Sequence, residues 1–227
     1  MKKAILIFIL IFCLISSATL HTSANASNVF LKNRSAGKKI ALTFDDGPHP
    51  IYTGRILEVL EEYGVKATFF VIGCNVENYP DAFKELLDSG CEIGNHTYSH
   101  KDIGKMSEKD VLYQLEKTEE AVSKFTDQKL SLCRPPEGSC GKALEAVSIE
   151  KGYDIILWSI DTLDWAHTPS ERIANKILDS TCGGDIVLMH DYVSGGCQAP
   201  DALRIIIPKL LDEGYEFVTV SELIGEE

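Results

Sequence analysis

The chain has 227 residues, of which 44% are hydrophobic, and a formal net charge of −12 at pH 7. This length suits one domain with a large core. The acidic charge argues against nucleic acid or an anionic membrane as a partner.

The N-terminal segment has the features of an export signal. Lys2 and Lys3 precede an apolar run from Ala4 to Leu20, and small residues follow up to Ala26. This order is typical of a secretory signal peptide, so we expect residues 1–26 to be cleaved before Ser27 or kept as an N-terminal anchor. A short polar leader, residues 27–37, and one domain, residues 38–227, complete the exported chain.

Six cysteines remain beyond the expected signal. An even number in an exported chain permits disulfides, but the sequence does not choose among the possible pairings. None of the spacings is C-x-x-C, so the cysteines do not predict a zinc site. The six are Cys74, Cys91, Cys133, Cys140, Cys182 and Cys197.

From Lys38 onward, apolar runs alternate with amphipathic helical patterns. Strands are predicted at residues 40–44, 67–72, 92–94, 130–133, 155–159, 186–189 and 216–220. Helices are predicted at residues 52–63, 80–89, 107–125, 142–151, 170–179 and 201–213. This alternation predicts an α/β fold with parallel strands and outer helices, either a barrel or an open doubly wound sheet.

Two aspartates, Asp45 and Asp46, follow the first predicted strand, and Gly47-Pro48 ends that strand. Successive side chains of a strand point to opposite faces, so a longer strand would bury one carboxylate unpaired. An ordinary Asp-Gly-Pro turn explains the pair. A site in which a metal or a cationic group holds both carboxylates also explains it, and this second explanation needs ligands from elsewhere in the chain.

Two histidines, His96 and His100, follow the third predicted strand. One helical turn would bring both imidazoles to the same face. Two exposed loop histidines are the ordinary alternative. Together with an aspartate from another strand end, however, the pair suits a catalytic divalent metal such as zinc.

Later strand ends also carry ionisable groups. Arg134 follows the fourth strand and could pair with a carboxylate across the site. Asp161, Asp164 and Trp165 follow the fifth strand, and His190 ends the sixth. Each has an ordinary explanation: a surface arginine, a polar loop with a packing tryptophan, and a structural histidine. Ionisable groups at five strand ends in chain order nevertheless favour a functional site.

The segments TFDDGP, HTYSH, RPPEG, DTLDW and LMHD, in this order, resemble the motifs of the polysaccharide deacetylases, carbohydrate esterase family 4. The resemblance implies a distorted (β/α) barrel of about seven parallel strands in a single catalytic domain. It also implies metal-dependent removal of N-acetyl groups from peptidoglycan or chitin-like glycans, with release of acetate. The expected cofactor is zinc, with cobalt as an alternative. The expected partner is an acetylated glycan. The protein is expected to be a monomer that is secreted or associated with the cell wall.

The resemblance assigns the metal site and the base position by position. Asp46, His96 and His100 are the expected metal ligands. Asp45 is the expected general base, and Arg134 is the partner that orients it. These roles make chemical sense, because a metal with three protein ligands activates both a water and the acetyl carbonyl, and a nearby carboxylate can take the water's proton.

The same resemblance assigns the acid and the substrate contacts. His190 is the expected general acid, and Asp164, beside Trp165, is expected to tune it. Leu188 is expected to line the acetyl pocket, and Pro136, Glu137 and Trp165 are the other expected substrate contacts. A backbone N–H in the turn of Pro136, Glu137 and Gly138 is the expected donor to the oxyanion.

Glu137 departs from the family pattern, in which an aromatic or a small residue is usual at this position. Its extra carboxylate is expected to alter substrate preference. Two alternative functions stay open: an O-acetyl ester hydrolase acting on acetylated xylan, and a catalytically silent glycan-binding wall protein. The presence of every expected metal ligand and of both proton-transfer residues argues against the silent protein. A metalloprotease is disfavoured, because HTYSH lacks the glutamate of H-E-x-x-H.

Overall fold

The computed structural model describes residues 28–225, so the expected signal peptide, residues 1–26, lies outside the described residues. Its centre is one sheet whose strands all pair in parallel. In spatial order the strands are β1 (Val29–Phe30), β6 (Asp154–Ile156), β5 (Leu132–Cys133), β4 (Glu92–Asn95), β3 (Thr68–Val71), β2 (Lys39–Asp45), β8 (Asp185–His190) and β7 (Ile160–Asp161), and β9 (Glu216–Phe217) pairs with β2 beside this path.

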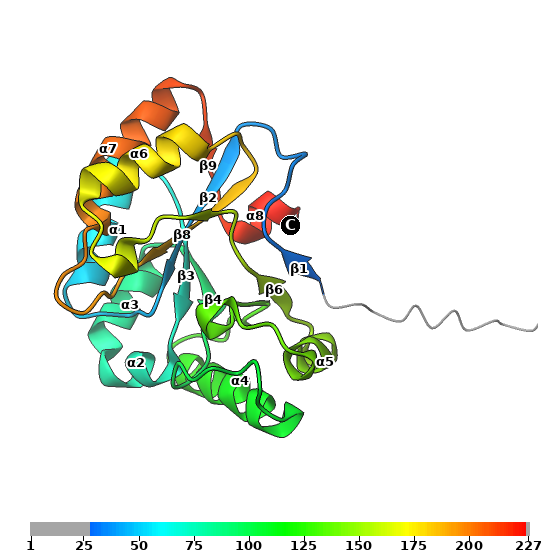
Figure 1. The fold of residues 1–227 in the computed structure, drawn as a ribbon. Coiled ribbons are helices and arrows are strands. Elements are labelled where there is room, and N and C mark those ends of the chain that lie inside the picture. The colour runs from blue at the N-terminus through cyan, green and yellow to red at the C-terminus, as the bar shows by residue number, and fades with distance from the viewer. Residues whose placement is uncertain (1–27, 226–227) are drawn as a thin grey trace, which may run out of the picture.

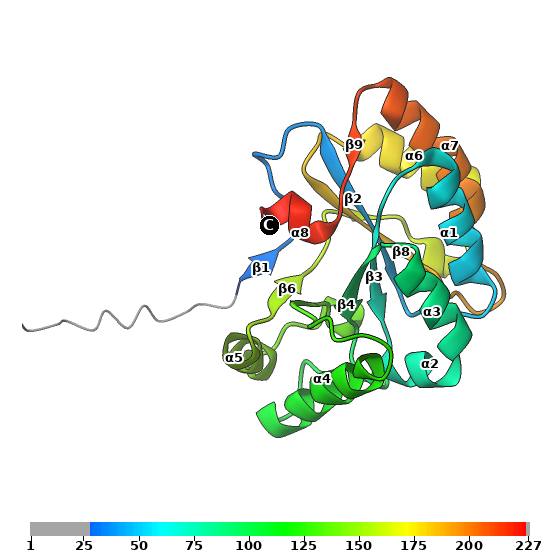
Figure 2. The same ribbon diagram turned by 180° about the vertical axis from the view of Figure 1, so that it is seen from behind.

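Helices form an arc around this sheet, which stays uncovered by long helices on the side of β1 and α8 (Figures 1 and 2). The helices are α1 (Tyr52–Tyr63), α2 (Gly73–Asn78), α3 (Pro80–Asp88), α4 (Glu108–Ser123), α5 (Lys142–Lys151), α6 (Ser170–Ser180), α7 (Ala199–Asp212) and α8 (Val220–Ile224). Parallel strands inside an arc of helices confirm the expected distorted (β/α) barrel. Among the helices of residues 28–225, none is long and apolar enough to cross a membrane.

Strand β2 shows how the sequence places polar groups inside the barrel. Ile40, Leu42 and Phe44 belong to the large core between the sheet and the outer helices. Ala41 packs in a smaller cluster on the opposite face. Because side chains alternate along a strand, Asp45 at its carboxyl end also faces the barrel interior.

An apolar plug fills one end of the barrel. Phe70, Leu132 and Ile186 meet Val220 and Leu223 of α8 in the smaller cluster. A capping box formed by the residue before α8 and Glu222 defines where this helix begins. Water-excluding packing at this end leaves the carboxyl ends of the strands as the place for polar chemistry.

The predicted strand at residues 155–159 is two strands in the structure. β6 ends beside β5, and β7 begins beside β8, at the other end of the sheet. Between them, Leu157 N–H donates to Phe30 O (2.8 Å) and Ser159 N–H donates to Ile186 O (3.0 Å). The chain therefore crosses from one side of the sheet to the other. The sequence did not predict this crossing, because an apolar run predicts an extended segment but does not say which strands lie beside it.

Four further elements differ from expectation. β1 lies in the expected polar leader, residues 27–37, and Lys32 from the same segment pairs with Asp185 at 3.2 Å. The helices α2 and α8 were not predicted, because each is too short for a clear helical period. The predicted strand at residues 216–220 ends at Phe217, where the chain turns into α8. The other predicted helices agree within two residues at each end.

Candidate active site

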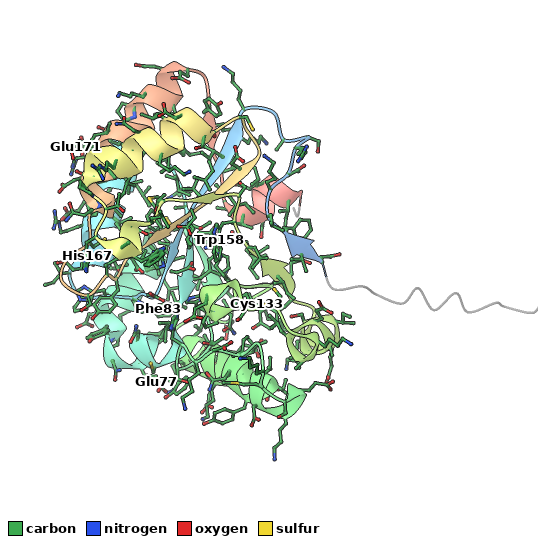
Figure 3. All side chains as sticks on the ribbon, in the orientation of Figure 1. Glu77, Phe83, Cys133, Trp158, His167 and Glu171 are labelled. Atoms are coloured by element: carbon green, nitrogen blue, oxygen red, sulfur yellow. The ribbon has the colours of Figure 1, made fainter. Side chains whose placement is uncertain are left out.

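A pocket of about 460 Å³ opens at the carboxyl ends of the strands. It is lined by Asp45, Asp46, His96, His100, Glu137, Trp158, Asp161, Trp165, Leu188 and His190. Figure 3 shows Trp158 near the middle of the molecule, whereas Glu77 and Glu171 lie at its periphery. The pocket thus gathers residues from five separate segments that the sequence analysis took as strand ends.

The three expected metal ligands converge. Asp46 has a φ of 80°, in the left-handed region, so the chain turns sharply after β2. Its Oδ1 lies 3.2 Å from His100 Nε2 and 3.4 Å from His96 Nε2. One ligand atom from each residue lies within 4.8 Å of the other two. This turn explains how adjacent aspartates can both serve one site.

The bonding of these residues fits a divalent cation. Asp46 Oδ1 is buried and makes no hydrogen bond among the described residues. His96 Nδ1 lies 2.7 Å from Arg134 O, and a carbonyl only accepts, so Nδ1 carries the proton and the Nε2 lone pair faces Asp46. Burial lowers the pKa of His96, but the negative charges of Asp45 and Asp46 raise it above its ordinary value. The carboxylates therefore favour positive charge at this point.

The two histidines converge by a route that differs from the predicted helical turn. Residues 96–100 form an irregular loop in which Thr97 has a φ of 68° and His100 a φ of 50°. The imidazole centroids of His96 and His100 lie 5.1 Å apart. Two left-handed residues give the pairing that one helical turn was expected to give.

Asp45 is held by the buried guanidinium of Arg134, which is 0% exposed. Nη1 of Arg134 donates to Asp45 Oδ1 and to Thr43 Oγ1, both at 2.7 Å. Nε and Nη2 donate to the carbonyls of Ile156 and Leu157, both at 3.1 Å. With four acceptors around it and the Phe70 ring 4.1 Å from its Cζ, the guanidinium is satisfied and fixed.

His190 is held by the buried carboxylate of Asp164. Its Nδ1 donates to Asp164 Oδ1 (2.8 Å), and its backbone N–H donates to Asp164 Oδ2 (2.8 Å). Burial lowers the pKa of His190, but the hydrogen bond and charge of Asp164 outweigh burial and raise the pKa to about 9. His190 is therefore a cation at neutral pH.

The comparison with known sequences decides the family. A sequence model of the polysaccharide deacetylase family matches residues 32–156. The chain belongs to this family. It is thus a member of the hydrolases called carbohydrate esterase family 4.

Relatives and solved structures agree with this membership. A peptidoglycan-N-acetylglucosamine deacetylase of Bacillus cereus (strain ATCC 14579) is 41% identical over 189 residues, which cover 82% of this chain and 88% of that protein. The crystal structure of the peptidoglycan N-acetylglucosamine deacetylase Bc1960 superposes with a TM-score of 0.83 at 35% identity, over 87% of this chain and 92% of that chain.

A third neighbour is a family 4 pseudoenzyme from Bacillus anthracis, with a TM-score of 0.82 at 30% identity, over 89% of this chain and 70% of that chain. The fold of the family therefore does not by itself establish activity. Activity in this family member therefore depends on its own catalytic groups.

The expected substrate contacts lie around the pocket of this family member. Trp165 is 54% exposed and Leu188 is buried in the pocket wall. Glu137 is exposed and lines the pocket with a φ of 57°, whereas Pro136 is buried in the turn and does not line the pocket. The turn offers one free donor, because Gly138 N–H donates to Pro135 O (3.0 Å) and Glu137 N–H has no partner among the described residues.

Two lining residues were not among the expected substrate contacts. Trp158 follows β6, in the segment that crosses between the sheet edges, and it was taken only as part of an apolar strand. Asp161 was noted at a strand end, and the structure places it in the pocket wall, where its Oδ1 accepts from Leu163 N–H (2.9 Å). The contact with His190 belongs to Asp164, as the family pattern implied.

Proposed function

We propose that the chain is an exported, metal-dependent N-deacetylase that removes acetyl groups from N-acetylglucosamine-type glycans, with peptidoglycan as the first candidate, and releases acetate. One observation carries the proposal: Asp45 and His190 are register partners on β2 and β8, and they line one pocket together with the Asp46 triad, which is Asp46, His96 and His100. Relatives described as peptidoglycan deacetylases support the substrate, and the signal-like N-terminus supports export.

The metal would be held by Asp46, His96 and His100. Two imidazoles and one carboxylate suit zinc, and cobalt accepts the same donors. When bound, the ion would polarise the acetyl carbonyl and make an attacking water acidic. Three protein ligands leave room for the water and the substrate beside them.

Asp45 would take the proton from the attacking water. Its Oδ1 accepts from Arg134, and its Oδ2 lies 3.7 Å from His96 Nε2 on the pocket side. A carboxylate fixed by a buried guanidinium keeps one orientation, so one oxygen stays directed into the pocket. Asp45 is thereby poised as a base beside the triad.

His190 would protonate the leaving nitrogen. An amine leaves from a tetrahedral intermediate only after its nitrogen gains a proton, whereas an alcohol is a better leaving group. The cationic state that Asp164 confers on His190 therefore favours an amide substrate over an ester. This is the reason to place the N-acetyl substrate ahead of acetylated xylan.

The acetyl group would lie between the triad and the wall formed by Leu188 and Trp165. Its carbonyl oxygen needs a preorganised donor as negative charge develops. The backbone N–H of Glu137, free of other partners among the described residues, is the donor we assign.

Acetate release tests this proposal. We would compare N-acetylglucosamine oligomers, purified peptidoglycan and acetylated xylan, each with added Zn²⁺ and after treatment with a chelator. Zinc-dependent release from the first two is expected, with loss in Asp45→Asn and retention in Asp179→Asn, a matched change at an exposed aspartate of α6. Release from xylan alone would replace the amide substrate with an ester, and no zinc-dependent release from any of the three would refute the proposal.

A further inference from the structure

The loop that carries His100 is held by side chains. Its four consecutive backbone N–H groups, residues 97–100, all donate to side-chain oxygens. Thr97 N–H donates to Asn95 Oδ1 (2.9 Å), and His100 N–H donates to Thr97 Oγ1 (3.2 Å). The two central groups, those of Tyr98 and Ser99, donate to one residue from a distant helix.

That residue is Gln114 of α4. Its Oε1 accepts from Tyr98 N–H (3.1 Å), Ser99 N–H (3.0 Å) and Ser99 Oγ (3.1 Å). Gln114 is 7% exposed, so these bonds form away from bulk water. Removing a buried acceptor leaves its donors unsatisfied, which is more costly than losing an exposed bond.

The opposite side of the loop is fixed by backbone. Gly73 N–H donates to Thr97 O (3.0 Å), and Cys74 N–H donates to Tyr98 O (2.9 Å) at the start of α2. These bonds anchor the first half of the loop. Ser99, the residue directly before His100, depends on Gln114 for both its amide and its hydroxyl.

The two histidines therefore differ in how they are held. His96 N–H donates to Val71 O (2.9 Å), and its Nδ1 donates to Arg134 O. His100 has a side chain that is 37% exposed, and its Nδ1 has no hydrogen-bond partner among the described residues. Among the described residues, the polar and ring contacts of the His100 imidazole are with Asp46 and His96 only, so the loop backbone sets where its ring lies.

An outer contact also reaches the loop. Tyr98 Oη donates to Glu77 (2.8 Å), which also accepts from Lys124 (2.6 Å). Glu77 lies at the outer edge of the molecule in Figure 3. Exposed ion pairs of this kind contribute little, so they do not replace the buried contact of Gln114.

We propose that Gln114 is a positioning residue that sets the metal affinity of the site by holding the loop of residues 97–100, which carries His100. The inference rests on the proposed function, because it takes Asp46, His96 and His100 as the ligands. Partners that orient a ligand without touching the ion commonly change metal affinity by about 10-fold to 100-fold.

Zinc affinity, measured on the purified protein by competition with a chromogenic chelator, tests this role. Gln114→Leu removes the acceptor, Gln114→Asn withdraws it by one methylene, and Gln114→Glu keeps an acceptor in place. The control is Gln128→Leu, the same change at an exposed glutamine in the loop before β5. Thermal unfolding of each metal-free variant separates a general loss of stability from a change at the site.

We expect zinc affinity to fall by about 10-fold or more in Gln114→Leu and Gln114→Asn, and to stay near wild type in Gln114→Glu and Gln128→Leu. Wild-type affinity in folded Gln114→Leu overturns the role. If that variant does not fold, unchanged affinity in Gln114→Asn overturns it instead. If the wild type binds zinc and releases acetate, and the Gln114 variants bind zinc equally well, only this inference is refuted. If the wild type does not bind zinc, the proposed function is refuted as well.

Discussion

Two buried ion pairs stand side by side at the ends of β2 and β8, and they are built with opposite polarity. In one, the permanently charged guanidinium of Arg134 lies against the carboxylate of Asp45. In the other, the carboxylate of Asp164 lies against His190. Each pair leaves one member facing the pocket and hides the other, since Arg134 and Asp164 do not line it.

The opposite polarity of the two pairs matches the proton-transfer roles proposed for their pocket-facing members. A carboxylate beside a permanent cation is held ready to accept a proton, and an imidazole beside a buried carboxylate is held ready to donate one. The sheet register places Asp45 and His190 next to each other on neighbouring strands, and both line the pocket. Five predictions test this contrast.

Asp45→Asn should break the accepting pair. Asparagine cannot take the proton of the attacking water, so kcat for acetate release should fall by about 10²-fold to 10⁴-fold. Zinc binding should persist, because the Asp46 triad is intact. Steady-state kinetics and a zinc titration on the same preparation check both parts, and a kcat near that of the wild type would remove Asp45 from the role of base.

Arg134→Met should break the same ion pair by removing its cation, the member that does not line the pocket. The change leaves Asp45 buried at the barrel mouth without its cation, and breaking a buried pair in this way costs roughly 3–5 kcal/mol of unfolding free energy. Denaturant unfolding measures the loss. The matched change Arg172→Met, at an exposed arginine of α6, should leave stability almost unchanged; equal losses in the two variants would contradict the buried role of Arg134.

Asp164→Asn should weaken the donating pair. The pKa of His190 should fall from about 9 toward its ordinary value of 6.5, because the opposing charge is gone. The alkaline decline of kcat should then begin at a lower pH than in the wild type. A pH–rate profile with an unmoved alkaline limb would show that Asp164 does not tune His190.

The same pair also predicts how stability changes with pH. The pKa of His190 is raised in the folded protein, so its contribution is fully present below about pH 6.5 and is lost as the pH rises through about 9. The difference in unfolding free energy between wild type and Asp164→Asn should thus be larger at pH 6 than at pH 9.5.

Thr43→Val should have the smallest effect on stability among these variants, because it leaves both ion pairs in place. Thr43 Oγ1 accepts from Arg134 and donates to Val187 O (2.6 Å), and valine has the same shape without the hydroxyl. Loss of these two hydrogen bonds, one of them from a charged donor, should lower the unfolding free energy by about 1–3 kcal/mol. Asp45 keeps its direct bond to Arg134, so kcat should change less than in Arg134→Met. A larger loss of kcat than of stability would assign Thr43 a closer part in the chemistry.

Much of the site could be predicted from the sequence, because its residues follow strands that are themselves easy to predict. Asp45 ends a strand in which apolar side chains alternate between the two faces, and Asp46 follows it. His190 ends another such strand. Parallel strands bring their carboxyl ends to one edge, so the motifs could be expected to meet before their geometry was known.

The supporting contacts could not be predicted in this way. Gln114 lies in a helix, and nothing in its local pattern shows that its side chain turns toward residues 98 and 99. Trp158 lies in an apolar run that would suit any buried strand. The residues that they contact are far away along the chain, and a local sequence pattern does not predict such long-range contacts.

The parallel α/β fold, the family and the residue types at the strand ends follow from the sequence, because periodicity and short motifs are local properties. Tertiary structure alone decided that the predicted strand at residues 155–159 crosses the barrel, that β1 joins the sheet, and that a loop rather than a helical turn pairs His96 with His100. Those outcomes depend on which distant groups satisfy each backbone N–H and C=O, and that choice is made only when the whole sheet assembles.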